Sequence, residues 1–284
     1  MEKKKDAFWG KKLFAIATLA GLAACATPVP VNKEVGALNF DYVALGKSKP
    51  TGKSIAIVSP QFVAAEVGAV QARPALRLSP YQQLMVGQTS YFYAQTVFQS
   101  SYQQRLNDAM ANSIQEIISR KGFTTKGPYT TFDDIPFGDK KTIYLTAVPT
   151  LKVYFDQKPA QSSCKGIVCT EQGEFTVTGE LVYKMIEPLT GQALMTKRIN
   201  LSDFAISKNY IKDTQVRPDS SLLEKMIDKA TAPDQLRDNT DRVMTEALNE
   251  FFKKAMAKID AFVSTEELMS FNGDVENLKG LKRF

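Results

Sequence analysis

Two segments with apolar side chains at helical spacing, residues 97–120 and 239–262, constrain the fold of this chain most strongly. In each segment the apolar residues recur every three or four positions, which is the period of one face of an α-helix. A helix with such a stripe is stabilised mainly by packing the stripe against another element. The stripe residues are Phe98, Tyr102, Leu106, Met110, Ile114, Ile117 and Ile118 in the first segment and Met244, Leu248, Phe251, Phe252, Ala255, Ile259 and Phe262 in the second.

Other segments alternate apolar and polar residues or form short β-branched runs, which are typical of strands. One of them is centred on Pro149, and because proline donates no hydrogen bond to a ladder, it is either one bent strand or two strands. Pro188–Gly191 has turn chemistry and joins two of the others. Strands are therefore expected at 54–59, 142–156, 174–187 and 193–204.

This order of elements predicts the fold class. A strand, a helix, several antiparallel strands and a second helix indicate an α+β chain. We expect a single two-layer domain over residues 38–284, in which a mainly antiparallel sheet packs against two long amphipathic helices.

The first 24 residues have the features of a signal peptide. Five lysines precede a short apolar run, Leu13–Ala24, which is too short to cross a bilayer as a helix. The run ends in Leu-Ala-Ala-Cys at Leu22–Cys25, so cleavage before Cys25 and lipidation of its thiol are expected, with a further chain such as palmitate on the freed amine. The alternatives are an ordinary secretory signal and an uncleaved anchor.

The lipid would tether the domain to a membrane. Residues 25–37, with Pro28 and Pro30, are expected to form an extended tether. Ala26 is not an aspartate, which favours the outer membrane over retention in the inner membrane.

Charge and composition exclude several classes of function. Loss of the first 24 residues removes five lysines and two acids and lowers the net charge from +6 to +3, so nucleic-acid binding has no support. The chain has no histidine, the usual general base and zinc ligand. No catalytic residue, metal or cofactor is predicted, the chain is not expected to be an enzyme, and Glu187 is expected to be a solvated acid.

Cys164 and Cys169 are the two cysteines that remain after Cys25. Because an exported chain enters an oxidising space, a disulfide that closes the tip of a hairpin is expected. The alternative, a redox pair, usually has two intervening residues rather than four.

Residues 62–94 contain several glycines and prolines and no sustained period, which predicts a long loop or insertion. Its aromatic cluster, Tyr91, Phe92 and Tyr93, either stacks on a sugar or fixes the loop to the domain. Residues 209–236 are polar, with a short helix expected at 221–229.

Five pieces of sequence occur in an order that resembles a known family, the Helicobacter neuraminyllactose-binding hemagglutinins, also described as flagellar-sheath adhesins. These pieces are Leu38–Tyr42, Ile57–Phe62, Tyr102–Leu106, Ile186–Gly191 and Leu278–Lys282.

The resemblance implies a lipoprotein of the outer membrane, at the cell surface or the flagellar sheath, that binds sialylated host glycans or host surface proteins. The family's basic glycan segment would follow Val153–Phe155, where only Lys158 and Lys165 are positive and no arginine occurs. Because a carboxylate favours an arginine fork or several donors, the alternative is a structural or assembly lipoprotein that contacts envelope proteins.

Overall fold

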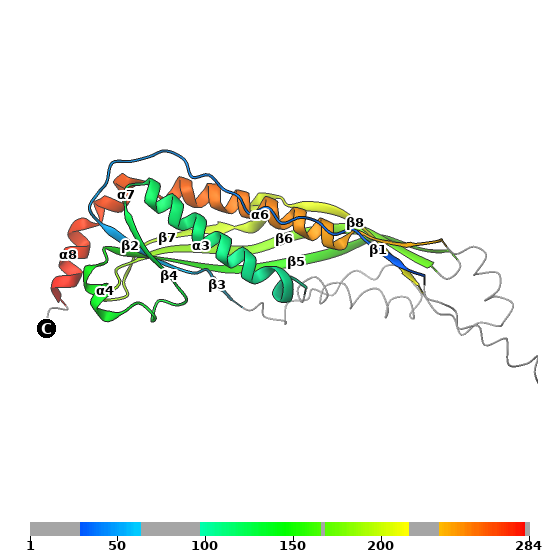
Figure 1. Ribbon diagram of the computed structural model, residues 1–284, viewed down its shortest axis with the longest axis horizontal. Coiled ribbons are helices and arrows are strands. Elements are labelled where there is room, and N and C mark those ends of the chain that lie inside the picture. The colour runs from blue at the N-terminus through cyan, green and yellow to red at the C-terminus, as the bar shows by residue number, and fades with distance from the viewer. Residues whose placement is uncertain (1–28, 64–96, 166–167, 216–232, 282–284) are drawn as a thin grey trace, which may run out of the picture.

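The computed structural model describes residues 29–63, 97–165, 168–215 and 233–281. Nine strands within these ranges form one sheet, and the long helices lie along it (Figure 1). The sheet consists of β1 (Val31–Lys33), β2 (Ser54–Val58), β3 (Gln61–Phe62), β4 (Thr124–Tyr129), β5 (Leu145–Lys165), β6 (Val168–Ile186), β7 (Ala193–Asn200), β8 (Ser207–Gln215) and β9 (Leu236–Asp238). The helices are η2 (Phe98–Tyr102), α3 (Gln103–Arg120), α4 (Phe137–Thr142), η3 (Leu201–Phe204), α6 (Thr240–Phe262), α7 (Thr265–Ser270) and α8 (Asn272–Leu281).

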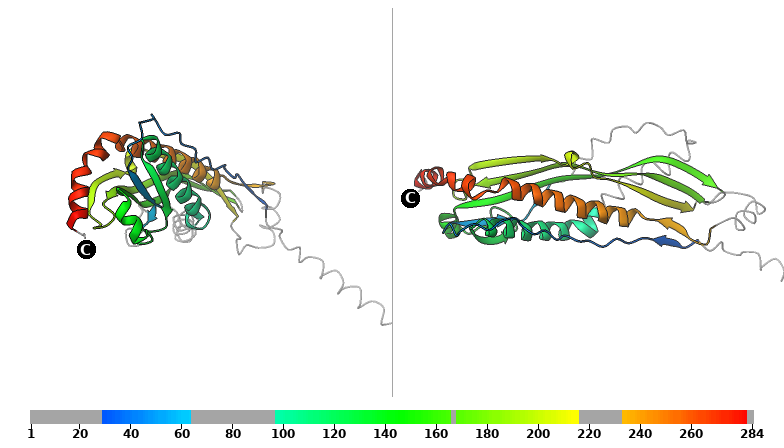
Figure 2. Two further views of the ribbon diagram at one scale, coloured as in Figure 1. Left: turned by 60° about the vertical axis from the view of Figure 1, so that its left-hand side comes forward. Right: turned by 90° about the horizontal axis from the view of Figure 1, so that it is seen from above.

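Both predicted amphipathic helices are present. The first segment begins with the π-helical turn η2 and continues as α3, and the second is α6. Their apolar stripes are buried in one core with the inward side chains of β5, β6 and β8, except that Phe262 is only partly buried. The two helices lie on the same side of the sheet (Figure 2). The α+β class is therefore confirmed.

The sheet is mainly antiparallel, but the short strands β1, β2 and β3 pair in parallel. Its order is β1-β9-β8-β6-β5-β2-β4, and the long ladders between β5, β6, β7 and β8 are antiparallel. However, β2 pairs in parallel with both β4 and β5, and β1 pairs in parallel with β9. Parallel pairing needs a long crossover, and α3 supplies one between β2 and β4.

The segment around Pro149 is a single strand, β5. One edge of β5 pairs with β2 as far as Ala147 and then with β3 from Thr150. Pro149 therefore lies at the break between these two partners, where a missing N–H donor costs little.

β6 shares one edge between two partners. β8 pairs with it over Val168–Thr176 and β7 over Glu180–Ile186. Gly179 lies between these ladders with a φ of +127°, and a Cβ at this position would stand 2.0 Å from the carbonyl oxygen of Lys152. Only glycine fits this position without a rearrangement.

The chain segment that follows β1 runs along α6. Beyond β1, residues 34–45, here called the strap, follow the helix in the same direction. Arg242 donates to the Glu34 carbonyl at 3.0 Å, the rings of Phe40 and Phe252 are 5.1 Å apart, and Leu45 donates to Asp260 at 2.7 Å. The tether expected at 25–37 therefore overlaps the fold, because hydrogen bonds to the sheet begin at Val29 and strand pairing begins at Val31.

Glu187 is not solvated as expected. It is 0% exposed, and its carboxylate accepts hydrogen bonds from the backbone amides of Leu189 and Thr190. The predicted turn at Pro188–Gly191 is confirmed, since Gly191 donates to the Glu187 carbonyl at 2.9 Å. The carboxylate therefore stabilises the turn from inside.

Some expectations fall outside the described residues. The predicted insertion at 62–94, apart from its first two positions, and the short helix at 221–229 are among them. The polar segment expected at 209–236 begins within β8 and ends in β9.

Candidate functional site at the disulfide-closed hairpin

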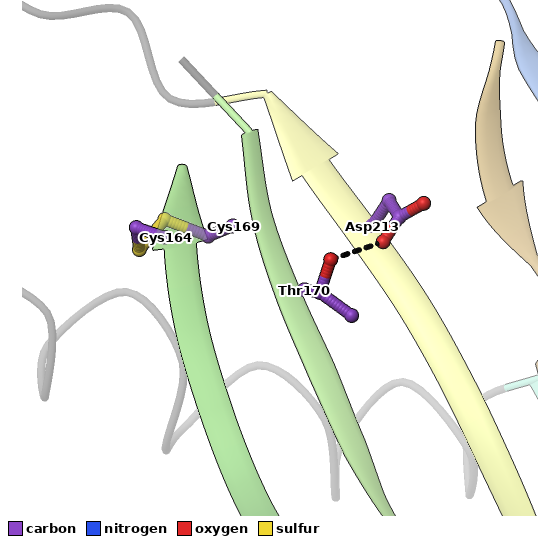
Figure 3. The surroundings of a disulfide bond; sticks show 4 residues. All are labelled: Cys164, Cys169, Thr170 and Asp213. Carbon is purple, nitrogen blue, oxygen red and sulfur yellow. Dashed lines mark hydrogen bonds between the residues drawn. A yellow bond between two sulfur atoms is a disulfide. The ribbon is translucent and has the colours of Figure 1, made fainter. Parts of the chain in front are cut away.

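The candidate site is the end of the long hairpin formed by β5 and β6. Its ladder runs from the pair Thr146–Ile186 to the pair Lys165–Val168. Near the end, Cys164 and Cys169 are cross-strand partners with Cα atoms 4.0 Å apart, joined by a disulfide (Figure 3). The expected position, at the tip of a hairpin, is thus the position in which the structure places both cysteines.

A bulge next to Pro159 decides which way the two candidate lysines point. The register shifts between Pro159 and Gln161, so one extra residue enters β5. As a result, Lys158 and Lys165 lie on the same face of the sheet, the face away from α3 and α6, and both are exposed. The structure brings them to one face despite their odd spacing in the sequence.

The two lysines are nevertheless far apart. At about 3.3 Å per residue, the stretch of strand between Lys158 and Lys165 is about 20 Å long. The Lys158 ammonium lies 3.8 Å from Asp156, and Glu174 is its cross-strand neighbour. One carboxylate needs donors at about 3 Å from its oxygens, so the two lysines do not form a single carboxylate site.

The hairpin end is fixed to β8 and β9 by a buried acid. Asp213 accepts hydrogen bonds from Thr170 at 2.6 Å and from the Arg237 guanidinium at 2.9 Å (Figure 3 shows Thr170 and Asp213). Burial alone would raise the pKa of the Asp213 carboxyl, but the hydrogen bonds from Arg237 and Thr170 outweigh it and lower that pKa. The sequence carried no signal for this group, because Asp213 and Arg237 lie in a polar segment without a period.

A small cavity lies further along the hairpin, toward the helices. It has a volume of about 10 Å³ and is lined by Gln157, Phe175, Val97 and the first turns of α6. The Oε1 atom of Gln157, a residue that is 2% exposed, has no hydrogen-bond partner among the described residues. A cavity of this size has room for about one water molecule and is too small for a sugar.

The other predicted site residues, Cys25 and the cluster Tyr91, Phe92 and Tyr93, lie outside the described ranges. Within those ranges, no helix combines the length and apolar character needed to span a membrane. The same part of the chain contains no group of three or more histidine, cysteine, aspartate or glutamate residues arranged to hold a metal ion.

Residues 88–282 match the family model described as neuraminyllactose-binding hemagglutinin precursor. The chain belongs to this family. The matched region contains α3, the hairpin and α6, whereas the strap and β2 precede it. The family is named for binding rather than for catalysis.

Two relatives are neuraminyllactose-binding hemagglutinins of Helicobacter pylori. One is 23% identical over 189 residues, and the other is 22% identical over 188 residues. Each match covers 63% of this chain and 70% of the relative.

A solved structure supports the family fold. The crystal structure of a neuraminyllactose-binding hemagglutinin homolog from Helicobacter pylori superposes with a TM-score of 0.50 at 14% identity. The match covers 82% of this chain and 98% of that one. At this identity the likeness shows the fold and leaves the ligand to be tested.

Proposed function

We propose that this protein is a lipid-anchored surface lipoprotein that acts as an adhesin. The observation that carries the proposal is its membership of a family named for binding neuraminyllactose. The Leu22–Cys25 sequence supports the anchor, because it supplies a thiol at the expected first mature position. The ligand class is then a sialylated glycan or a host surface protein.

Direct binding tests the ligand. The purified, detergent-solubilised lipoprotein should bind sialyllactose saturably, and lactose without the sialic acid should compete poorly. The expected physical basis is charge, because the carboxylate is the main difference between the two sugars. Saturable binding that does not distinguish the two sugars, or no saturable binding, removes the sialylated glycan.

The aromatic cluster at positions 91–93 is proposed to stack on the sugar. A Tyr91→Ala, Tyr93→Ala double variant should then bind sialyllactose more weakly, because an aromatic face contributes stacking and apolar contact. Unchanged affinity would leave the cluster with the role of fixing its own segment.

Lipidation of Cys25 is tested by the mass of the mature protein. Acylated peptide should begin at Cys25, and a Cys25→Ser variant should leave the membrane fraction. An unmodified cysteine, or a variant that fractionates with membranes like the parent, would contradict the anchor.

The location proposed is the outer membrane, either the cell surface or the flagellar sheath. Protease added to intact cells should degrade an adhesin, because its domain faces outward. Full protection would favour the second candidate function, a structural or assembly lipoprotein that contacts envelope proteins. Lys158 and Lys165 are far apart, and Asp156 and Glu174 lie beside Lys158. This mixture of charges favours the second candidate, because it complements the surface of a protein partner better than the single carboxylate of a sialylated glycan.

A further inference from the structure

The N-terminal end of the described chain lies beside the end of the hairpin. The backbone amide of Val29 donates to Oε1 of Gln215 at 3.1 Å. Gln215 pairs with Val168 across β8 and β6, and Val168 pairs with Lys165 across β6 and β5. Val29 and the hairpin end therefore lie at the same end of the molecule, here called the anchored end.

Chain length then limits where the lipid can be. Cys25 precedes Val29 by four residues, which span at most about 14 Å even when fully extended. By contrast, β5 has 21 residues and extends for about 65 Å from Lys165 to Leu145. The lipid is consequently confined to the neighbourhood of the anchored end.

The opposite end of the molecule, here called the far end, is formed by different elements. Tyr144, just before β5, donates its hydroxyl to the Leu268 carbonyl in α7 at 2.7 Å. The loop of residues 46–53 is attached there, since Ser48 donates to the Arg120 carbonyl at the end of α3 at 2.8 Å. Figure 1 shows α7 and β2 at one end and β1 and β8 toward the other.

We propose that the anchored end rests on the headgroup layer of the bilayer and that the far end points away from the membrane. This inference rests on the proposed lipidation of Cys25. The exposed side chains at the anchored end include the polar or charged Lys33, Ser163, Lys165 and Thr214, with Val31 as an apolar exception. Polar and charged side chains suit the wet headgroup layer and are too costly to place in the hydrocarbon.

The proposed orientation makes the hairpin a less accessible place for a host ligand to bind. Lys158 and Lys165 lie on the membrane-proximal part of the hairpin, where a host glycan has the poorest access. A partner that approaches from outside the cell meets the far end first. The loop there carries Lys47, Lys49 and Lys53 on a backbone held by the ends of α3 and of the strap.

Single-tryptophan fluorescence tests the orientation. The only tryptophan of the chain is Trp9, in the segment expected to be cleaved, so one introduced tryptophan reports one position. Ser163→Trp marks the anchored end, and Ser270→Trp marks the far end as a matched exposed serine. Each acylated protein is placed in phosphatidylcholine vesicles with and without a nitroxide on the lipid headgroup.

The tryptophan at position 163 should be quenched several-fold more strongly than that at position 270. Equal quenching, stronger quenching at position 270, or no quenching at position 163 would overturn the orientation. Mass spectrometry of the same samples first establishes acylation of Cys25. If Cys25 is not acylated, the proposed anchor is wrong. If Cys25 is acylated but the quenching does not follow the expected order, the anchor stands and the orientation is wrong.

Discussion

Asp260 joins three parts of the molecule through one carboxylate. It is 3% exposed and lies near the end of α6, where Oδ2 accepts from the Tyr42 hydroxyl at 2.8 Å and from the Leu45 amide at 2.7 Å. Oδ1 lies 2.8 Å from the Lys121 ammonium, just after α3. Burial alone would raise the pKa of Asp260, but the hydrogen bonds from Leu45, Lys121 and Tyr42 lower it below the ordinary value of 3.8.

Replacing Asp260 should make the protein less stable and less sensitive to acid. An Asp260→Asn variant loses the ion pair with Lys121, and the free energy of unfolding at neutral pH should fall by about 2–4 kcal/mol. Because the pKa in the folded state is lowered, the stabilisation is present above the ordinary pKa and lost as the pH falls through the folded-state pKa. Parent and variant should therefore converge in strong acid.

Denaturant unfolding at neutral pH and in acid measures both effects. Asp133→Asn is the matched control, because Asp133 is exposed and its neutralisation should change stability by less than about 0.5 kcal/mol. If the difference in free energy of unfolding between the parent and Asp260→Asn stayed constant into strong acid, the ionised carboxylate would not be the source of the stabilisation.

Gly179 is a second residue on which the fold depends. A Gly179→Ala variant should lose about 2 kcal/mol of stability or more, since a φ of +127° and a carbonyl 2.0 Å from the new Cβ both oppose a side chain. Thermal unfolding measures the loss. Gly138→Ala is the control, because nothing lies within 4 Å of its Cβ position, and a loss of similar size in both variants would contradict the assignment.

At the scale of the elements, the disulfide closes a very short loop in a hairpin that is already paired. A Cys164→Ser, Cys169→Ser double variant should unfold with a free energy lower by about 2 kcal/mol, the value expected for a loop of this length. Backbone amide exchange should rise near Thr170, because without the disulfide the hairpin end is held only by the hydrogen bonds of Asp213 with Thr170 and Arg237. Exchange in α3, which lies away from the hairpin end, should stay unchanged. Unchanged unfolding and exchange would indicate that the bond does not form in the native protein.

The elements that could be predicted are those in which the apolar pattern repeats many times. The stripes of α3 and α6 and the alternation in β5 and β6 are repeated often enough to indicate the element and its buried face. β1, β3 and β9 have three, two and three residues, which are too few to show a period. Their pairing depends on contacts distant in the sequence, so the parallel pairs of β1 with β9 and of β3 with β5 were not predicted.

The candidate site was predicted only in part. The sequence suggested a disulfide hairpin with Lys158 and Lys165 near it, and the structure places them there. Their separation depends on the register and on the bulge beside Pro159, which local sequence does not reveal. The burial of Glu187 was missed for a related reason, since two of its hydrogen-bond donors are backbone amides, which any sequence supplies, and the third is the Thr190 hydroxyl.

At the scale of the whole molecule, the proposed orientation predicts which lysines would affect attachment if the protein is an adhesin. A Lys47→Glu, Lys49→Glu variant reverses two charges at the far end. Adhesion to sialylated cells should fall several-fold, because an exposed charge pair contributes up to about 1 kcal/mol. The count of bound bacteria measures this effect.

The matched control is Lys158→Glu, Lys165→Glu, which makes the same change in charge on the hairpin. It should leave adhesion close to that of the parent strain. If this variant lost adhesion while the far-end variant adhered normally, the glycan site would lie on the hairpin and not at the far end.

The strap also determines how mechanical load would travel through the protein. It connects β1, near the proposed lipid anchor, directly to the loop of residues 46–53 at the far end. If the protein is anchored at Cys25 and binds its partner at that loop, as proposed, tension between the two would run along one extended piece of covalent backbone. The force would then act on the covalent backbone of the strap and not on the packing between the sheet and the helices. The domain could therefore carry tension without separation of its strands.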